Sequence, residues 1–245
     1  MTKIIEGIVL KATDYQEKSK ILQIISKEHG LISLYLRGAN NYKSIGFLLA
    51  QPLTHASFSV YYKEGLSSCF SGEILNSFQS LKLDFSKNIF IYHLFELVLK
   101  SIEKHQTLPY LYVLLLEIME RIEGDLDEST KHLLIMTFEI KLLYFLGVAP
   151  EIDRCVECSQ DRFITTFDVY KGGLVCKNCL DHRSVIYSRE AMSLLIQLYY
   201  LKIEELSDIK PISKQGLKEL RQIIDQYYDY YLGIKTNSRQ YLNII

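Results

Sequence analysis

The sequence lacks the features that would place the protein in a membrane or outside the cell. No run of eighteen uninterrupted apolar residues occurs in the 245-residue chain, so we expect no transmembrane helix. The initial stretch MTKIIEGIVLKATDY has neither the long apolar run nor the cleavage site of a signal peptide. We therefore expect a cytoplasmic protein, in which thiols stay reduced.

The chain also lacks an excess of either charge. It has 28 Lys and Arg against 29 Asp and Glu, a formal net charge of −1. This balance does not indicate a nucleic-acid partner, but it is compatible with a basic stripe on one face. Residues 1–80 carry 8 basic against 6 acidic residues, and residues 186–245 carry 8 against 7. These two regions are the favoured anion-facing surfaces.

Motifs of the common enzyme classes are missing as well. The sequence contains no P-loop GxxxxGK[ST], no HExxH, no GxSxG and no GxGxxG. Its six histidines are scattered, and no pair stands at metal-ligand spacing beside a carboxylate. We expect no enzyme and no small-molecule substrate, so the function is sought in binding.

What is present begins with a β-rich segment, residues 1–79. Alternating, β-branched stretches such as IIEGIVLKATDY and LISLYLRG are separated by short turns, with Gly30 in the turn KEHG. Five short strands with this spacing predict a small closed barrel of the OB-fold type. An SH3-like barrel is the nearest alternative, since strand count alone does not separate the two.

Near Ser80 the apolar period changes from two to 3.6, which predicts a helical domain made of residues 80–150 and 186–245. Its helices are expected at FSKNIFIYHLFELVLKSIEKH, LPYLYVLLLEIMERIEG, DESTKHLLIMTFEIKLLYFLG, SREAMSLLIQLYYLKI and SKQGLKELRQIIDQYYDYYLG. Ser188 and Ser213 are the expected N-caps of the last two. The fold class is thus α+β and multidomain.

Cysteine is scarce, but four of the five cysteines stand in one short segment. Cys155, Cys158, Cys176 and Cys179 form two Cys-x-x-Cys pairs with seventeen residues between them. That spacing is typical of a zinc ribbon, in which each pair delivers two thiolates to one tetrahedral ion. The intervening FITTFDVYKGGLVC predicts two strands joined by a Gly172-Gly173 turn. Residues 151–185 are therefore predicted to be a zinc-binding insertion with one structural Zn²⁺.

Other interpretations of the cysteines fit less well. A redox dithiol needs a βαβ context that is missing, and two disulfides would suit a secreted chain. Catalytic zinc needs an open coordination position, which four thiolates do not leave. His182 is an alternative ligand in place of Cys179, although we expect an exposed loop histidine there. Cys69, alone in a predicted strand, is expected to be a small buried hydrophobe.

A barrel, a helical body and a four-Cys ribbon inserted in that body are an unusual combination, and together they resemble the RecO family of bacterial recombination mediators. The resemblance covers essentially the whole chain. It is carried by EGIVLKATDYQEKSKIL, HGLISLYLRGAN with Lys43-Ser44, QPL from Gln51, FEIKLLYFLGVAPEIDRCVEC, GGLVCKNC and KTNSRQYL, in this order and spacing.

The resemblance implies a nucleoid-associated DNA-repair protein without covalent turnover. RecO-like proteins carry an N-terminal OB-fold and a helical C-terminal domain. They bind single- and double-stranded DNA and anneal complementary strands. They work with RecR, contact the acidic C-terminal tail of single-strand binding protein, and help to load RecA. Such a tail would need an apolar pocket with a basic rim.

The barrel contains residues that suit single-strand binding, which combines a basic groove with aromatic stacking platforms. The candidate basic residues are Arg37, Lys18, Lys20, Lys43 and Lys11, and the candidate platforms are Tyr42, Tyr15 and Tyr35. Arg37 is the strongest candidate, because Gly38 follows it and lets a phosphate approach the backbone. Each lysine has the alternative of a solvated surface charge, and for Tyr35 we favour barrel packing.

One departure from the family pattern affects affinity. Asn40 and Asn41 stand where the family usually has further basic residues, and contacts from Asn to phosphates are neutral. DNA affinity is then weaker, or other surfaces contribute. Basic residues near the ribbon and at the C-terminal helix are candidates: Arg154, Arg162, Lys171, Lys177, Arg183, Lys218, Arg221, Lys235 and Arg239.

Two other functions stay open at this point. A zinc-ribbon transcription regulator would read base edges, but no basic recognition helix is found. A protein–protein adaptor would use its ribbon and helices without any DNA affinity. The tyrosines of YYDYY, from Tyr227 to Tyr231, are expected to be mostly core because of their helical spacing.

Overall fold

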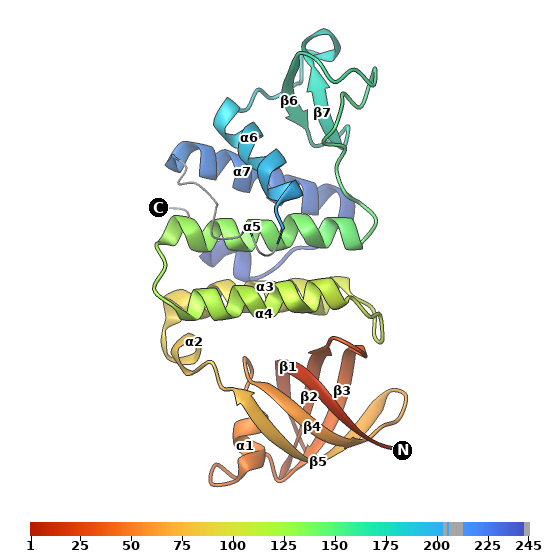
Figure 1. The fold of residues 1–245 in the computed structure, drawn as a ribbon, viewed down its shortest axis with the longest axis vertical. Coiled ribbons are helices and arrows are strands. Elements are labelled where there is room, and N and C mark those ends of the chain that lie inside the picture. Colours follow the sequence, from red (N-terminus) through yellow and green to blue (C-terminus); the bar gives the residue numbers. More distant parts are fainter. Residues whose placement is uncertain (203–204, 206–212, 243–245) are drawn as a thin grey trace. The chain divides into compact units, whose positions relative to one another are not determined.

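The computed structural model describes residues 1–202, 205 and 213–242 (Figure 1). Contacts group the chain into two compact units, Met1–Asp125 and Leu126–Ile245. The first unit contains five strands: β1 (Thr2–Tyr15), β2 (Ser19–Ser26), β3 (Gly30–Arg37), β4 (His55–Tyr61) and β5 (Leu66–Asn76). It also contains the helices α1 (Ile45–Leu49), α2 (Gln79–Leu83), α3 (Phe85–Ser101) and α4 (Pro109–Glu123).

The five strands form a closed barrel in the order β1-β2-β3-β5-β4. Neighbours are antiparallel except β3 and β5, which are parallel, and β1 also pairs with β4. The short helix α1 lies in the connection from β3 to β4. This is the OB-fold arrangement, so the predicted barrel is confirmed and the SH3-like alternative is wrong.

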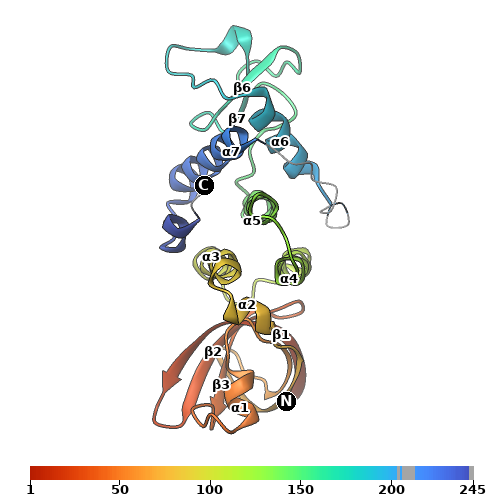
Figure 2. The same cartoon turned by 90° about the vertical axis from the view of Figure 1, so that its left-hand side faces the viewer.

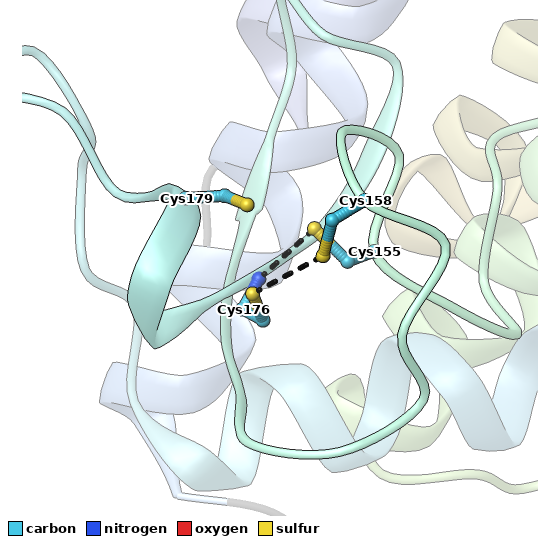
Figure 3. Close-up of side chains that lie close together, drawn as sticks. All are labelled: Cys155, Cys158, Cys176 and Cys179. Carbon is cyan, nitrogen blue, oxygen red and sulfur yellow. Dashed lines mark hydrogen bonds between the residues drawn. The ribbon is translucent and has the colours of Figure 1, made fainter.

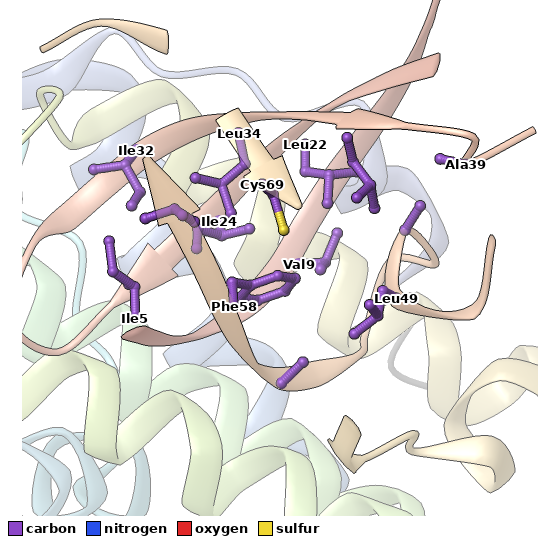
Figure 4. Close-up of a cluster of buried hydrophobic side chains, with 14 residues drawn as sticks. Ile5, Val9, Leu22, Ile24, Ile32, Leu34, Ala39, Leu49, Phe58 and Cys69 are labelled. Atoms are coloured by element: carbon purple, nitrogen blue, oxygen red, sulfur yellow. The ribbon is translucent and has the colours of Figure 1, made fainter. Parts of the chain in front are cut away.

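The barrel interior is filled by the apolar side of each strand, as period-two patterning requires. Val9, Leu22, Leu34 and Phe58 have no exposed surface and point into one cluster (Figure 4). Cys69 belongs to the same cluster, and burial raises the pKa of its thiol to about 11. The prediction that Cys69 is a buried hydrophobe is confirmed.

The turn at Gly30 is fixed by a close approach to another segment. Gly30 has a φ of +63°, and a Cβ there would stand 2.1 Å from the carbonyl oxygen of Gln106. The N–H of His105 donates to the carbonyl of Leu31 at 3.0 Å, which holds this segment against the β2–β3 turn. Only glycine satisfies both the positive φ and the space.

Helices α3 and α4 lie side by side next to the barrel (Figure 2). Asp84 caps α3 by accepting from the N–H groups of Ser86 and Lys87. Helix α4 reaches the barrel through Tyr112, whose hydroxyl lies 3.2 Å from the carboxylate of Glu6 and 3.1 Å from the His55 ring. This polar contact holds α4 against strands β1 and β4.

The second unit contains α5 (Glu128–Phe145), α6 (Arg189–Tyr200) and α7 (Lys214–Tyr227), with the hairpin β6 (Ile164–Asp168) and β7 (Gly173–Cys176). Ser188 and Ser213 cap α6 and α7 through their side chains, as predicted. Helix α7 continues into a π-helical turn, Tyr228–Leu232, which ends at Gly233 with a φ of +62°. Among the helices that the structure describes, none is both long and apolar enough to cross a bilayer.

A buried ion network joins three segments of this unit. Glu139 of α5 is 1% exposed at its side chain and accepts two hydrogen bonds from Arg221 of α7, at 2.6 and 2.9 Å. Arg221 also contacts Asp225 at 2.8 Å. Arg239, in the C-terminal stretch KTNSRQYL, lies 3.1 Å from Asp225 and 2.7 Å from Asp229. The C-terminal segment is therefore held to α7 by charge pairing.

Candidate functional site

The cysteine insertion is built on the β6–β7 hairpin that the sequence predicts. Gly172 has a φ of +81°, and a Cβ on Gly173 would stand 2.4 Å from the carbonyl oxygen of Glu151. The N–H of Leu174 donates to that same oxygen, and the N–H of Glu151 donates to Gly172. The N–H of Val156, inside the first Cys-x-x-Cys pair, donates to the carbonyl of Leu174 at 2.9 Å and holds that pair against the hairpin that carries the second.

The four cysteine side chains form one cluster, as Figure 3 shows. The sulfurs of Cys155, Cys158, Cys176 and Cys179 all lie within 4.8 Å of one another. Cys155 and Cys176 are buried, and Cys158 is exposed. The 3₁₀ turn Lys177–Cys179 places the last thiol beside the strand that ends at Cys176.

Backbone N–H groups and neighbouring thiols give these cysteines very different acidities. Burial opposes ionisation of Cys155, but N–H groups of Cys176, Cys158 and Glu157 outweigh it and lower its pKa to about 6. Hydrogen bonds with the Cys158 and Cys176 thiols instead raise the pKa of Cys179 to about 12. Four thiolates this close repel one another, so a bound cation is what would favour the fully ionised set.

The side chain of Lys171 contacts residues next to the cysteine cluster. The Nζ atom of Lys171 lies 3.4 Å from the carbonyl oxygen of Cys179, 3.4 Å from Asp181 and 3.7 Å from Glu157. Glu157 lies within the first Cys-x-x-Cys pair, and Asp181 follows the second. Lys171, in the hairpin turn, therefore contacts the segments of both Cys-x-x-Cys pairs.

The donor set fits a metal ion. Four cysteine sulfurs within reach of one centre are the ligands of a closed tetrahedral site. His182 is exposed and does not belong to the group found among the described residues, so the alternative of a His ligand is not supported. The arrangement can hold a metal ion, and it leaves no coordination position for substrate.

A second candidate site lies at one end of the barrel. The β1–β2 turn, residues 16–18, and the loop after β3, residues 38–44, are held together there: the side-chain amide of Asn40 donates to the carbonyl of Glu17 at 3.2 Å. Ser19 pairs with Arg37 across β2 and β3. Two segments that the sequence separates by some twenty residues thus form one surface.

The predicted basic residues differ in how available they are. Arg37, Lys18 and Lys43 are exposed at this end of the barrel. Lys43 lies over the ring of Tyr42, 5.7 Å from its centroid. Lys20 pairs with Asp14 at 2.6 Å, so its ammonium group already has a carboxylate partner.

Lys11 stands apart from that group. It is exposed on β1 opposite Gln23, four residues before Tyr15. The barrel end therefore brings together Arg37, Lys18, Lys43 and Tyr42, whereas Lys11 lies along the strand.

The predicted tyrosine platforms also differ. Tyr42 is 72% exposed and Tyr15 is 43% exposed. Tyr35 is half-buried, meets the Tyr15 ring edge-on at 5.9 Å, and shares a 2.9 Å hydrogen bond with Ser19. Packing therefore describes Tyr35 better than stacking, as the sequence favoured.

Two sequence-based candidates are corrected by the second unit. The sequence offers Arg221 and Arg239 as candidates for an extension of a DNA path, but both are engaged in the ion network around Glu139 and Asp225.

In the tyrosine stretch from Tyr227 to Tyr231, Tyr227 and Tyr228 are buried, whereas Tyr230 is 56% exposed. The expectation that this stretch is mostly core is right for its first two rings and wrong for Tyr230.

A pocket of about 450 Å³ lies beside the β6–β7 hairpin, between α7 and the loop that follows the second Cys-x-x-Cys pair. Phe167, Val169, Val185 and Tyr187 are among its apolar lining residues. The charged residues that line it are two acids and two bases, namely Asp168, Asp181, Lys171 and Arg183. The charged part of the lining is therefore mixed, with no excess of basic residues.

Comparison with known proteins gives a consistent result over the whole chain. The family described as Recombination protein O N terminal matches residues 1–78, and Recombination protein O C terminal matches residues 82–240. The chain is 32% identical over 242 residues to the DNA repair protein RecO of Bacillus pumilus, covering 97% of this chain and 92% of that protein.

Two further relatives give the same coverage. The chain is 32% identical over 240 residues to the DNA repair protein RecO of Listeria innocua, and 29% identical over 242 residues to that of Bacillus subtilis. In both cases 97% of this chain and 92% of the relative are covered.

Proposed function

Because the chain belongs to the RecO family, with a function in DNA repair and recombination, we propose that it is a recombination mediator that binds and anneals DNA strands. It binds single- and double-stranded DNA, acts with RecR, contacts the acidic C-terminal tail of single-strand binding protein, and helps to load RecA on coated DNA. It does so in the cytoplasm at the nucleoid, without turning over a covalent bond.

The observation that supports this best is the exposed basic end of the OB-fold barrel. Arg37, Lys18 and Lys43 are exposed there beside the Tyr42 ring. Arg37 forms no ion pair with any residue that the structure describes. Phosphate-directed contacts of this kind carry no sequence information, so bases stay free to pair with a second strand. That is the requirement of an annealing protein.

We assign separate roles to the three parts of the chain. Residues 1–79 bind DNA, residues 80–150 and 186–245 form the helical body, and residues 151–185 hold one structural Zn²⁺. Four thiolates fill a tetrahedron, and zinc prefers this donor set. The ion then stabilises the insertion and takes no part in a reaction.

A salt titration of a charge-reversal variant tests the DNA site. We expect the double variant Arg37→Glu/Lys43→Glu to bind a labelled single-stranded oligonucleotide at least ~10-fold more weakly than wild type, with a salt slope smaller by about 1.4. The slope falls because the variant makes two fewer phosphate contacts and its binding therefore releases fewer counterions. Fluorescence anisotropy between 50 and 200 mM salt measures both values.

The matched control is Lys27→Glu/Lys104→Glu, which makes the same change in net charge. Both lysines are exposed near the β2–β3 turn, at the opposite end of strand β2 from the basic surface. Equal losses in the two variants would show a long-range effect of net charge without a local site. A wild-type protein that binds no DNA even at 50 mM salt would favour the protein–protein adaptor.

A further inference from the structure

Two aromatic rings lie exposed and in contact on the outer face of the barrel. Tyr61 of β4 is 53% exposed and Phe70 of β5 is 51% exposed. Their ring centroids are 4.8 Å apart and the ring planes are inclined by 40°. An exposed pair of this size leaves apolar surface in water that the fold itself does not bury.

A β-bulge lies at Phe70. Val60 pairs with Cys69 and Ser59 pairs with Ser71, so Phe70 is the extra residue on β5. Cys69 points into the barrel core, while Phe70 and Ser71 are both exposed. Bulges of this kind redirect a side chain, and they are common next to functional sites.

The surroundings leave the rings accessible. Tyr61 faces Ser68 across the strands, and Ser59 faces Ser71. These small hydroxyl side chains on both strands form a low, polar surface around the pair. The ring surface is therefore open to a planar group from outside.

An exposed arginine lies at the next position of the sheet. Leu36 pairs with Cys69, so Arg37 and Phe70 occupy the next positions of the parallel strands β3 and β5. Lys63 is exposed in the turn that follows Tyr61, next to Glu64. Asp and Glu are absent from β3, from β4 and from residues 66–72 of β5.

We propose that Tyr61 and Phe70 form a stacking platform for the bases of a single-stranded nucleic acid whose phosphates run past Arg37. Base stacking on aromatic rings is tolerant of sequence and contributes independently of phosphate contacts. The platform extends the basic barrel end along the sheet surface. This inference rests on the proposed function, because it names the surface that the bases contact.

Nucleic acid is favoured over a protein partner by the combination of features. A protein interface buries an apolar centre of larger extent, with few charges at its core. Here two rings are set among serines with an exposed arginine beside them, which suits a planar base and its phosphate.

The absence of tryptophan from the chain gives a direct test. In Phe70→Trp, the new indole is the only one in the protein. We expect its fluorescence to be quenched when oligothymidylate is added, and to change little with an abasic oligonucleotide of equal length. Stacking needs a base, whereas phosphate contact does not.

Substitution of both rings measures their contribution. Tyr61→Leu/Phe70→Leu keeps apolar side chains but removes the flat rings, so we expect at least ~5-fold weaker binding of oligothymidylate. The salt slope and the affinity for the abasic strand should stay unchanged. The swapped variant Tyr61→Phe/Phe70→Tyr should bind like wild type. Leu75→Ala, at an outward residue of the same strand that is 48% exposed, is the matched control.

The outcomes separate this inference from the proposed function. Wild-type binding with no quenching of the Phe70→Trp indole, together with unchanged affinity of the double leucine variant, would overturn the platform and leave DNA binding intact. A wild-type protein that binds no oligonucleotide would overturn both.

Discussion

Replacing Cys176 by serine is expected to abolish metal binding and to unfold the cysteine insertion while the barrel keeps its intrinsic DNA affinity. Cys176 is a buried strand residue whose sulfur lies 3.7 Å from that of Cys158. A serine oxygen is a poor replacement for a thiolate at a closed four-sulfur site. Structural zinc sites supply on the order of 10 kcal/mol of folding free energy, so losing a ligand is costly.

The size of this effect depends on how much of the insertion's core is made by the thiols. The buried cluster around them contains Cys155, Val175 and Cys176, with a few partly buried neighbours. Other residues of the insertion, among them Phe167 and Leu174, are buried outside that cluster. Two of the three cluster residues are proposed metal ligands. A segment of about 35 residues rarely buries enough apolar surface to fold without a metal or a disulfide.

Metal content and thermal unfolding check this prediction. Wild type should contain one zinc per chain by elemental analysis, and Cys176→Ser close to none, with an additional low-temperature unfolding transition. Cys69→Ala is the matched control, because Cys69 lies in the barrel core and should leave the zinc content unchanged. A Cys176→Ser protein that is fully stable but has lost DNA binding would contradict a purely structural role.

Breaking the buried pair between Arg221 and Glu139 is the second large effect. Arg221→Met should lower the free energy of unfolding by about 3–5 kcal/mol, since it removes two charge-assisted hydrogen bonds from a buried carboxylate. Glu139 is 1% exposed at its side chain. Although burial opposes the charged form of Arg221, Glu139 and Asp225 raise its pKa and keep it protonated.

A double-mutant cycle separates pairing from packing. The double variant Glu139→Gln/Arg221→Met should be less destabilised than the sum of the single variants, because the buried negative charge that Arg221 neutralises is then absent as well. Lys218→Met, an exposed charge removal on the same helix, should change stability by less than about 0.5 kcal/mol. Additive single effects in denaturant titrations would show that the pair is not coupled.

Local patterns predicted the elements well. Alternation gave the strands of the barrel, and Ser188 and Ser213 marked the starts of α6 and α7. The Cys-x-x-Cys spacing predicted a cluster that the fold closes to 4.8 Å. These signals are local in the chain, so they do not depend on knowing which distant segments meet.

What the sequence could not predict depends on register and on distant contacts. Arg221 reads as a surface charge on an amphipathic helix, and only its meeting with Glu139, 82 residues away, makes it a core residue. Alternation after the buried Cys69 places Phe70 on the outer face of its strand. Its contact with Tyr61 depends on the pairing of β4 with β5 and on the bulge at Phe70, which local patterns do not show.

The measurement that tests the central claim most directly is strand annealing of complementary oligonucleotides coated with the cognate single-strand binding protein. It is run with intact binding protein and with binding protein that lacks its acidic C-terminal tail, across a salt series and without nucleotide. Acceleration that depends on the tail is the predicted result. No acceleration, together with no binding of naked strands at low salt, would contradict the assignment as an annealing mediator.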